Sequence, residues 1–248
     1  MKDFSLNVNS SVYDVLIISE SWLCQNISNE ELNLNNYNIF RADRNSNTSE
    51  KVCGGGVLIA VKKDFRASVI LSGRFVESIY INFKHNNLDL IVGGVYIPPA
   101  SHLNVYENYC SDLECIFEKF PNSSYIIAGD FNLPLSNWNR NDMQFNSFGN
   151  FREYCEVICL TAAFMNMQQV NSIPNSRGVY LDLIFSNIVN IDICHAIDPI
   201  FSESFHHSQL SWFVSSVDLP ILYYESRIFD FTNGDYNILN EFAHNLVR

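Results

Sequence analysis

Residues 125–132 read Tyr-Ile-Ile-Ala-Gly-Asp-Phe-Asn, an apolar run that ends in a glycine, a carboxylate and an amide. The run is rich in β-branched and aromatic residues, which is typical of a strand covered on both faces. Asp130 and Asn132 stand two residues apart at its end, so their side chains face the same way. The stretch therefore predicts a buried strand that delivers two polar groups to one edge of a sheet.

Similar apolar segments recur on both sides of this run and predict further strands. They cover residues 15–19, 56–61, 78–83, 88–97, 180–186 and 209–214. Residues 102–120 and 146–160 instead place apolar side chains three and four positions apart, which predicts two helices. Because no repeat or Gly/Ser linker divides the chain, we expect one α/β domain with sheets packed together and helices outside.

The composition excludes several classes of protein. The chain has 248 residues, of which 47% are hydrophobic and 17% charged, so it is not a disordered protein. Its net charge of −12 repels phosphates, which counts against a simple DNA-binding module without metal ions or a local basic patch. Seven cysteines without a C-x-x-C pair argue against a disulfide or zinc framework. With no long apolar run and no signal peptide, we expect a soluble nuclear or cytoplasmic protein that is not secreted.

Several polar residues at strand ends are candidates for a site. Asp130 could activate a water and Asn132 could hold developing charge, although both also suit a turn that caps backbone N–H groups. Glu20 closes the strand 15–19 and is either a ligand for a hard metal ion or an exposed acid. Asp182 is flanked by apolar residues, a costly position for a carboxylate unless it is paired or metal-bound. Tyr96, at another strand end, either donates a hydrogen bond to a phosphate or is a core residue.

His206 and His207 are adjacent, so on an extended segment their side chains point to opposite faces and only one of them can enter a site. Either residue alone is more often structural than catalytic. No P-loop, G-x-S-x-G or H-E-x-x-H motif occurs in the sequence.

The order of these motifs resembles the endonuclease/exonuclease/phosphatase superfamily, and within it the endonuclease domain of non-LTR retrotransposons, especially jockey-like elements. The strings that carry the resemblance are Tyr-Asp-Val-Leu-Ile-Ile-Ser-Glu-Ser-Trp-Leu, Phe-Arg-Ala-Asp-Arg, Gly-Gly-Gly-Val-Leu-Ile-Ala-Val, Gly-Asp-Phe-Asn-Leu-Pro and Leu-Asp-Leu-Ile-Phe-Ser-Asn. The resemblance implies a DNase I-like two-sheet α/β sandwich over residues 1–220. Residues 221–248 resemble the connector that precedes a reverse transcriptase, which implies that such a domain is fused in the parent element.

The resemblance also implies a reaction, the hydrolysis of a DNA phosphodiester with Mg²⁺, or Mn²⁺ in its place. Glu20 is similar to the metal-binding glutamate and Tyr96 to the phosphate-contacting tyrosine. The other four roles fall to residues that lie later in the chain. They are Asp130 for preparing the water, Asn132 for stabilising the transition state, and Asp182 for supporting the metal or the catalytic histidine, which His207 matches better than His206.

Two departures from the family pattern predict an impaired copy. The first strand of the family, with an asparagine that helps to hold the metal, is expected to be missing, because residues 2–15 look like the helix and loop that follow it. The aspartate expected just before the histidine is replaced within Ser-Phe-His-His, residues 204–207, which should leave the imidazole less well oriented. Two alternatives stay open: a catalytically dead remnant that acts at most as a binding domain, and a phosphatase of the same fold.

Overall fold

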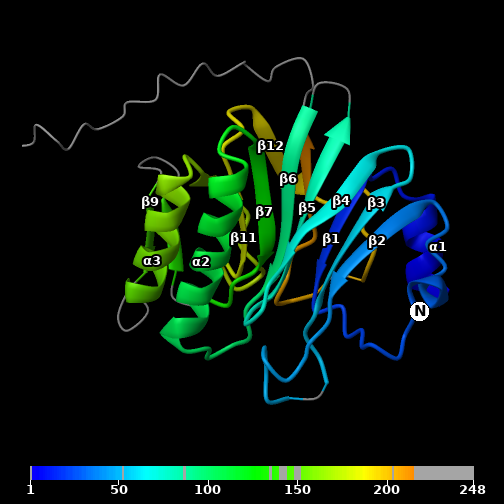
Figure 1. Cartoon of the computed structure of the whole chain (residues 1–248), viewed down its shortest axis with the longest axis horizontal. Helices are drawn as coiled ribbons and strands as arrows, with labels where there is room; N and C mark the ends of the chain where they lie inside the picture. Colours follow the sequence, from blue (N-terminus) through cyan, green and yellow to red (C-terminus); the bar gives the residue numbers. More distant parts are fainter. Residues whose placement is uncertain are drawn as a thin grey trace, which may run out of the picture.

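The computed structural model describes residues 2–51, 53–85, 88–133, 136–139, 144–147, 152–202 and 204–214. Two sheets dominate it (Figure 1). The larger has six strands in the order β10-β11-β7-β6-β5-β4. Its strands are β4 (Arg66–Ser72), β5 (Glu77–His85), β6 (Leu88–Tyr96), β7 (Ser124–Asp130), β10 (Gln168–Gln169) and β11 (Asp182–Ser186). Strands β6 and β7 run parallel, and their other neighbours in the sheet are antiparallel.

The smaller sheet has the order β1-β3-β2, with β1 (Val15–Ser19), β2 (Tyr37–Ala42) and β3 (Val57–Lys62). Two antiparallel pairs accompany the sheets. They are β12 (Ile191–His195) with β13 (Leu210–Val214), and β8 (Ser136–Asn139) with β9 (Gln144–Ser147). The β12–β13 pair contributes partly buried residues, Ile193 and Trp212 among them, to the core between the two sheets.

Strands β3, β6 and β7 are apolar at nearly every position because each lies between two cores. On β3, Val57, Ile59 and Val61 face the core between the sheets, whereas Leu58 and Ala60 face the opposite side. The sheets approach closely at Gly94 of β6. A Cβ there would lie 2.6 Å from Val57 Cγ1 and 3.0 Å from Ile17 Cγ2, so only glycine lets β6 pack this near to β1 and β3.

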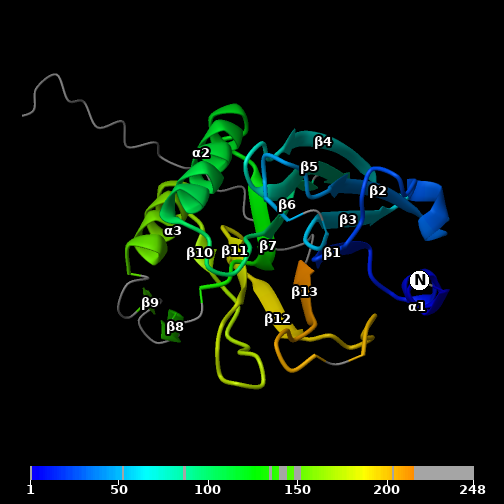
Figure 2. The same ribbon diagram turned by 90° about the horizontal axis from the view of Figure 1, so that it is seen from below.

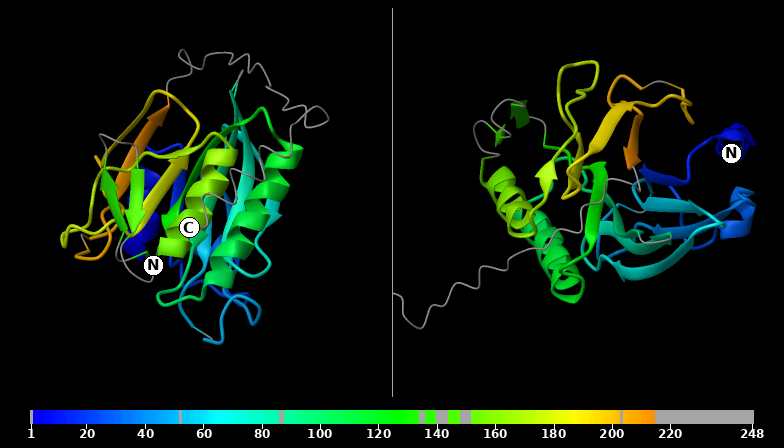
Figure 3. Two further views of the ribbon diagram at one scale, coloured as in Figure 1. Left: turned by 90° about the vertical axis from the view of Figure 1, so that its left-hand side faces the viewer. Right: turned by 90° about the horizontal axis from the view of Figure 1, so that it is seen from above.

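Helices cover the outer face of each sheet (Figures 2 and 3). α2 (Leu103–Lys119) and α3 (Arg152–Phe164) lie on the larger sheet, and α1 (Lys2–Ser10) and the short 3₁₀ helix η1 (Asn29–Leu32) lie on the smaller one. The buried side chains of α2 recur at three- and four-residue intervals, which gives the helix one apolar face. They are Tyr106, Tyr109, Cys110, Leu113 and Ile116.

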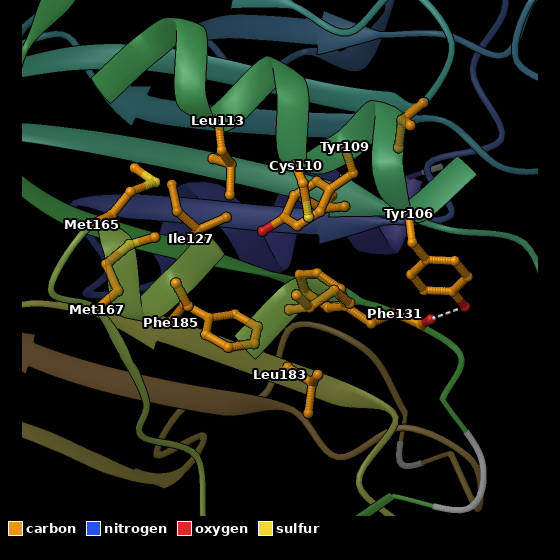
Figure 4. Packing of buried hydrophobic residues seen from close by; sticks show 14 of the residues in the cluster. Tyr106, Tyr109, Cys110, Leu113, Ile127, Phe131, Met165, Met167, Leu183 and Phe185 are labelled. Carbon is orange, nitrogen blue, oxygen red and sulfur yellow. Dashed lines mark hydrogen bonds between the residues drawn. The ribbon is translucent and has the colours of Figure 1, made fainter. Parts of the chain in front are cut away.

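The core under α2 and α3 also fixes the end of β7 (Figure 4). Phe131 is fully buried and makes edge-to-face contacts with Tyr109 and Phe185, at centroid distances of 5.3 and 5.5 Å. Its carbonyl accepts a hydrogen bond of 2.9 Å from the Tyr106 hydroxyl. The residue between Asp130 and Asn132 is therefore anchored in the core, which fixes where both polar neighbours lie at the end of β7.

The two-sheet α/β sandwich with helices outside is the fold that the sequence predicted, and each predicted strand is present within a residue or two of its expected ends. The helix predicted over 146–160 was wrong at its start, because β9 occupies Gln144–Ser147 and α3 begins only at Arg152. Residues 148–151 and the predicted connector 221–248 lie outside the described residues. Among the helices that the structure describes, none is long and apolar enough to cross a membrane.

Candidate active site

Strand register places three of the predicted site residues at one level of the larger sheet. Tyr96 is the Cα partner of Asp130 across β6 and β7, and Asp130 is the partner of Asp182 across β7 and β11. Along these strands Val92, Ile126 and Ile184, an even number of positions away, face the core between the sheets. Side chains two residues apart share a face, so the three polar groups meet at the end of that core.

Asp130 is buried and held by Asn132. A Cβ at Gly129 would overlap the backbone of Val95, so the close approach of β6 and β7 just before Asp130 requires a glycine. Asn132 adopts a left-handed backbone (φ 48°), from which its N–H and Nδ2 donate to the Asp130 carboxylate at 3.1 and 2.7 Å. The second Nδ2 hydrogen bond, of 2.9 Å, goes to the carbonyl of Ile97. The turn-capping and functional interpretations of this pair thus describe the same geometry.

The pKa of Asp130 is raised to about 7, because the side chain is buried and the Asp182 carboxylate repels a second negative charge. His207 and the two hydrogen bonds from Asn132 act in the opposite direction. Burial also raises the pKa of Asp182, an effect that His207 partly offsets. The two neighbouring carboxylates therefore carry negative charge that the protein only partly compensates.

His207, and not His206, contacts this cluster. Its Nδ1 lies 3.0 and 3.1 Å from the two carboxylate oxygens of Asp182, and its Nε2 lies 3.9 Å from Asp130 Oδ2. The hydrogen bond to Asp182 raises the pKa of His207 to about 9, although burial works against it. Asp182 holds the imidazole through Nδ1, although Ser204 stands where an aspartate was expected. The side chain of His206 is exposed, and its carbonyl accepts a hydrogen bond from Asn175 Nδ2.

Glu20 and Tyr96 form the other half of the site. Glu20 follows β1 in a left-handed conformation (φ 53°), and its exposed side chain accepts a 2.5 Å hydrogen bond from the Tyr96 hydroxyl. Tyr96 is buried, and burial together with the Glu20 carboxylate raises the pKa of the phenol well above its ordinary value. Tyr96 is therefore both a core residue and a protonated donor at the site.

A buried ion pair supports this half, and sequence reasoning missed it. Arg44 Nε lies 2.6 Å from Glu77 Oε1, with side chains only 6% and 0% exposed. Glu77 Oε2 accepts from the N–H of Gly56, and Arg44 Nη1 donates to the carbonyl of Cys53. Arg44 Cζ also lies 5.8 Å from the centroid of the Tyr96 ring. The three glycines before β3 and the arginine in Phe-Arg-Ala-Asp-Arg were the available signals.

The residues present fit a hard divalent cation. Ligand atoms of Asp130, Asp182 and His207 lie within 4.8 Å of one another. Because His207 is protonated at neutral pH, the groups free to bind a metal are the two carboxylates and the exposed carboxylate of Glu20 beside Tyr96. Carboxylate oxygens are the donors that Mg²⁺ and Mn²⁺ prefer. Burial and the neighbouring Asp182 carboxylate both raise the pKa of Asp130, and a bound cation would oppose both effects by stabilising the ionised form.

Comparison with known proteins gives a family match over part of the chain. Residues 90–209 match a family model described as endonuclease-reverse transcriptase, a segment that holds Tyr96, Asp130, Asn132, Asp182 and His207 but not Glu20. No curated protein sequence matches the chain.

Solved structures share the fold at low sequence identity. The endonuclease domain of TRAS1, a telomere-specific non-LTR retrotransposon, is 13% identical with a TM-score of 0.58, over 84% of this chain and 88% of that one. The AP endonuclease LMAP from Leishmania major is 13% identical with a TM-score of 0.57, over 85% and 81%. The human Nocturnin catalytic domain is 10% identical with a TM-score of 0.50, over 86% and 87%. Over residues 90–209 the chain is therefore similar to the endonuclease-reverse transcriptase family, and it shares its fold with the endonuclease domain of TRAS1.

Proposed function

We propose that this chain is a Mg²⁺-dependent endonuclease that hydrolyses a phosphodiester of DNA and leaves a nick, with Mn²⁺ able to replace Mg²⁺. One observation carries the proposal. The cluster of the buried Asp130 with the partly buried Asp182 and His207 lies at the end of the sandwich where Tyr96 meets Glu20. Such an arrangement offers a base, a cation, a neutral donor and metal-binding oxygens within one site.

Asp130 is the base in this scheme. A carboxylate with a pKa near 7 is partly ionised at neutral pH and still basic enough to take a proton from water. Both hydrogens of the Asn132 amide are engaged, one by Asp130 and one by Ile97. Asn132 therefore orients the base in this arrangement, and its contact with the transition state stays a prediction.

His207 and Tyr96 stabilise the charge that develops on the phosphate. Asp182 keeps His207 cationic around neutral pH, so Nε2 is a charged donor toward the space beside Asp130. The phenol of Tyr96 stays protonated, and its one hydrogen, which goes to Glu20 in this structure, would turn to the phosphate once Glu20 holds the cation. Fixed donors of this kind act most strongly where charge appears only in the transition state.

Glu20 would hold the divalent cation, whose chemistry is to neutralise the phosphate and the leaving oxygen. Because this site offers few protein carboxylates, we expect a dissociation constant for Mg²⁺ on the order of millimolar or weaker. Isothermal titration calorimetry of the full chain and of Glu20→Gln tests this. Tight binding that survives the substitution would assign the metal to other residues.

The proposal also covers the element from which the chain derives and the rate at which the chain cuts DNA. A jockey-like element is the expected parent, with a reverse transcriptase domain following residues 221–248. We propose that this copy cuts slowly, because a net charge of −12 weakens DNA capture and Ser204 stands where an acidic residue is expected. The contact between Asp182 and His207 keeps the imidazole oriented, which reduces the effect of the missing acid at position 204.

The test is nicking of supercoiled plasmid at low salt by the full chain, with Mg²⁺, Mn²⁺ or a chelator, against Asp130→Asn. We expect slow, metal-dependent nicking that the variant lacks and that Ser204→Asp increases. If Ser204→Asp gives no increase, the impairment has another origin. DNA binding without nicking would favour the remnant, and hydrolysis of small phosphoesters alone would favour the phosphatase.

A further inference from the structure

We infer that Trp22 is a stacking residue for a nucleobase next to the bond that is cut. The inference rests on the proposed endonuclease function and adds to it a class of preferred substrate. It starts from an exposed indole: the Trp22 side chain is 66% exposed, although Trp22 lies only two residues after Glu20. A tryptophan has an apolar ring and a polar N–H, so an exposed one beside a site offers a contact for a ligand with an apolar face.

The backbone holds Trp22 in a conformation that its side chain disfavours. Both Glu20 and Trp22 are left-handed, with φ of 53° and 56°, which is uncommon for residues that carry a Cβ. Two hydrogen bonds to the glycine loop maintain this turn, from Ser21 N to the Gly56 carbonyl (3.1 Å) and from Trp22 N to the Gly55 carbonyl (2.9 Å). Such backbone strain gathers at functional positions.

The indole also lies beside the Glu20–Tyr96 half of the site. A Cβ placed on Gly54 would lie 3.9 Å from Trp22 Cε2 and 3.4 Å from Arg44 Nη1, so indole and guanidinium lie against the same glycine. Arg44 in turn lies over the ring of Tyr96, whose hydroxyl meets Glu20. Trp22 therefore stands at the rim of the Glu20–Tyr96 half, on a support fixed by the buried pair of Arg44 and Glu77.

The chemistry of the exposed ring selects its ligand. A planar apolar surface beside a phosphate site fits the face of a nucleobase, and stacking of this kind tolerates any base. A chain of net charge −12 gains little from phosphate attraction, so stacking supplies affinity that charge does not. Stacking requires a base that has left its own stack. The preferred substrate is thus DNA with an unpaired or easily unstacked base beside the cut.

The test measures DNA binding without cleavage, using the full chain with Asp130→Asn and Mg²⁺. Fluorescence anisotropy compares labelled duplexes with and without one mismatch, for Trp22→Ala, Trp22→Leu and Trp22→Tyr. We expect the Ala and Leu variants to bind the mismatched duplex about 5- to 100-fold more weakly, and Tyr to stay within about threefold of Trp. Phe164→Ala, which removes another exposed aromatic side chain from α3, is the matched control and should change nothing.

Equal binding by Trp22→Ala, or equal rescue by Leu and Tyr, would overturn the inference. Thermal unfolding of each variant should stay close to the parent, since the indole is exposed. The two proposals fail separately. A chain that binds through Trp22 but never nicks plasmid contradicts the endonuclease function, whereas one that nicks normally as Trp22→Ala contradicts the stacking role.

Discussion

The two halves of the site are held in place by different means. Asp130 and Asp182 sit on paired central strands, where register alone sets their separation and hydrogen bonds from Asn132 and His207 complete the cluster. Glu20 instead follows an edge strand on a strained turn, and its position depends on a glycine loop tied to the buried pair of Arg44 and Glu77. Residues borne by strands are thus positioned by the sheet itself. Those borne by loops need a separate support.

The largest effect on activity should come from the strand-borne half of the site, which contains Asp130 and Asp182. Asp130→Asn keeps the shape of the side chain but removes the base, and we expect cleavage to fall by about 10³-fold. Initial rates of plasmid nicking measure this loss. Asp192→Asn, an exposed acid on β12, is the control and should nick like the parent. Nicking by Asp130→Asn within tenfold of the parent would remove Asp130 from its proposed role.

The support of the loop-borne half is tested by Arg44→Met. Leaving Glu77 buried without its partner should lower the free energy of unfolding by about 3–5 kcal/mol. Chemical denaturation of the full chain measures the change. Arg152→Met breaks an exposed pair, with side chains 77% and 52% exposed, and should cost below about 1 kcal/mol. Similar losses in both variants would mean that the Arg44–Glu77 pair is not a special support.

The charge state of His207 tests the half of the site that contains Asp130 and Asp182, because His207 is hydrogen-bonded to Asp182. In metal-free protein, NMR titration should place the pKa of His207 near 9, and Asp182→Asn should return it toward the ordinary value near 6.5. Since folding raises this pKa, His207 stabilises the fold fully below pH 6.5 and loses that contribution as the pH rises through 9. An unchanged titration in Asp182→Asn would contradict the pairing.

The smallest effect should come from a peripheral contact of the support. Thr48 Oγ1 lies 3.3 Å from Glu77 Oε1 at the edge of the ion pair, and it shares its one hydrogen between this oxygen and the Asn45 carbonyl at 3.2 Å. Thr48→Val should lower the free energy of unfolding by only about 0.5–1 kcal/mol, measured by the same denaturation. A loss as large as that of Arg44→Met would show that the hydroxyl and not the guanidinium holds Glu77.

The strand-borne half could be predicted from the sequence because each residue ends or interrupts an apolar run, and the period of a strand fixes which side chains share a face. The support of the loop-borne half could not. Arg44 and Glu77 are 33 residues apart, and nothing local shows that they pair. Strands β2, β4 and β12 also escaped prediction. In β4, for example, Arg66 and Ser68 are interspersed with apolar residues on a largely exposed edge, which weakens the apolar signal.

The choice between His206 and His207 also depends on contacts between residues that are far apart in the sequence. Alternation along an extended segment separates the two rings but does not say which face meets the site. That depends on the turn at Asn175 and Ser176, whose side chains hold the carbonyls of His206 and Phe205. Those contacts span about thirty residues of sequence and appear only in the folded chain.

Close packing at Gly94 has a consequence for how the site tolerates change. Gly94 lies two residues before Tyr96 on β6, directly against Val57 and Ile17 of the other sheet. The Tyr96–Glu20 hydrogen bond joins those same two sheets, so its length depends on the gap between them. One added methyl group at Gly94 would widen that gap and pull Glu20 away from Tyr96 without touching either residue. The distance between the two sheets thus sets the length of the Tyr96–Glu20 hydrogen bond. A substitution in the hydrophobic interior can therefore act as an active-site mutation.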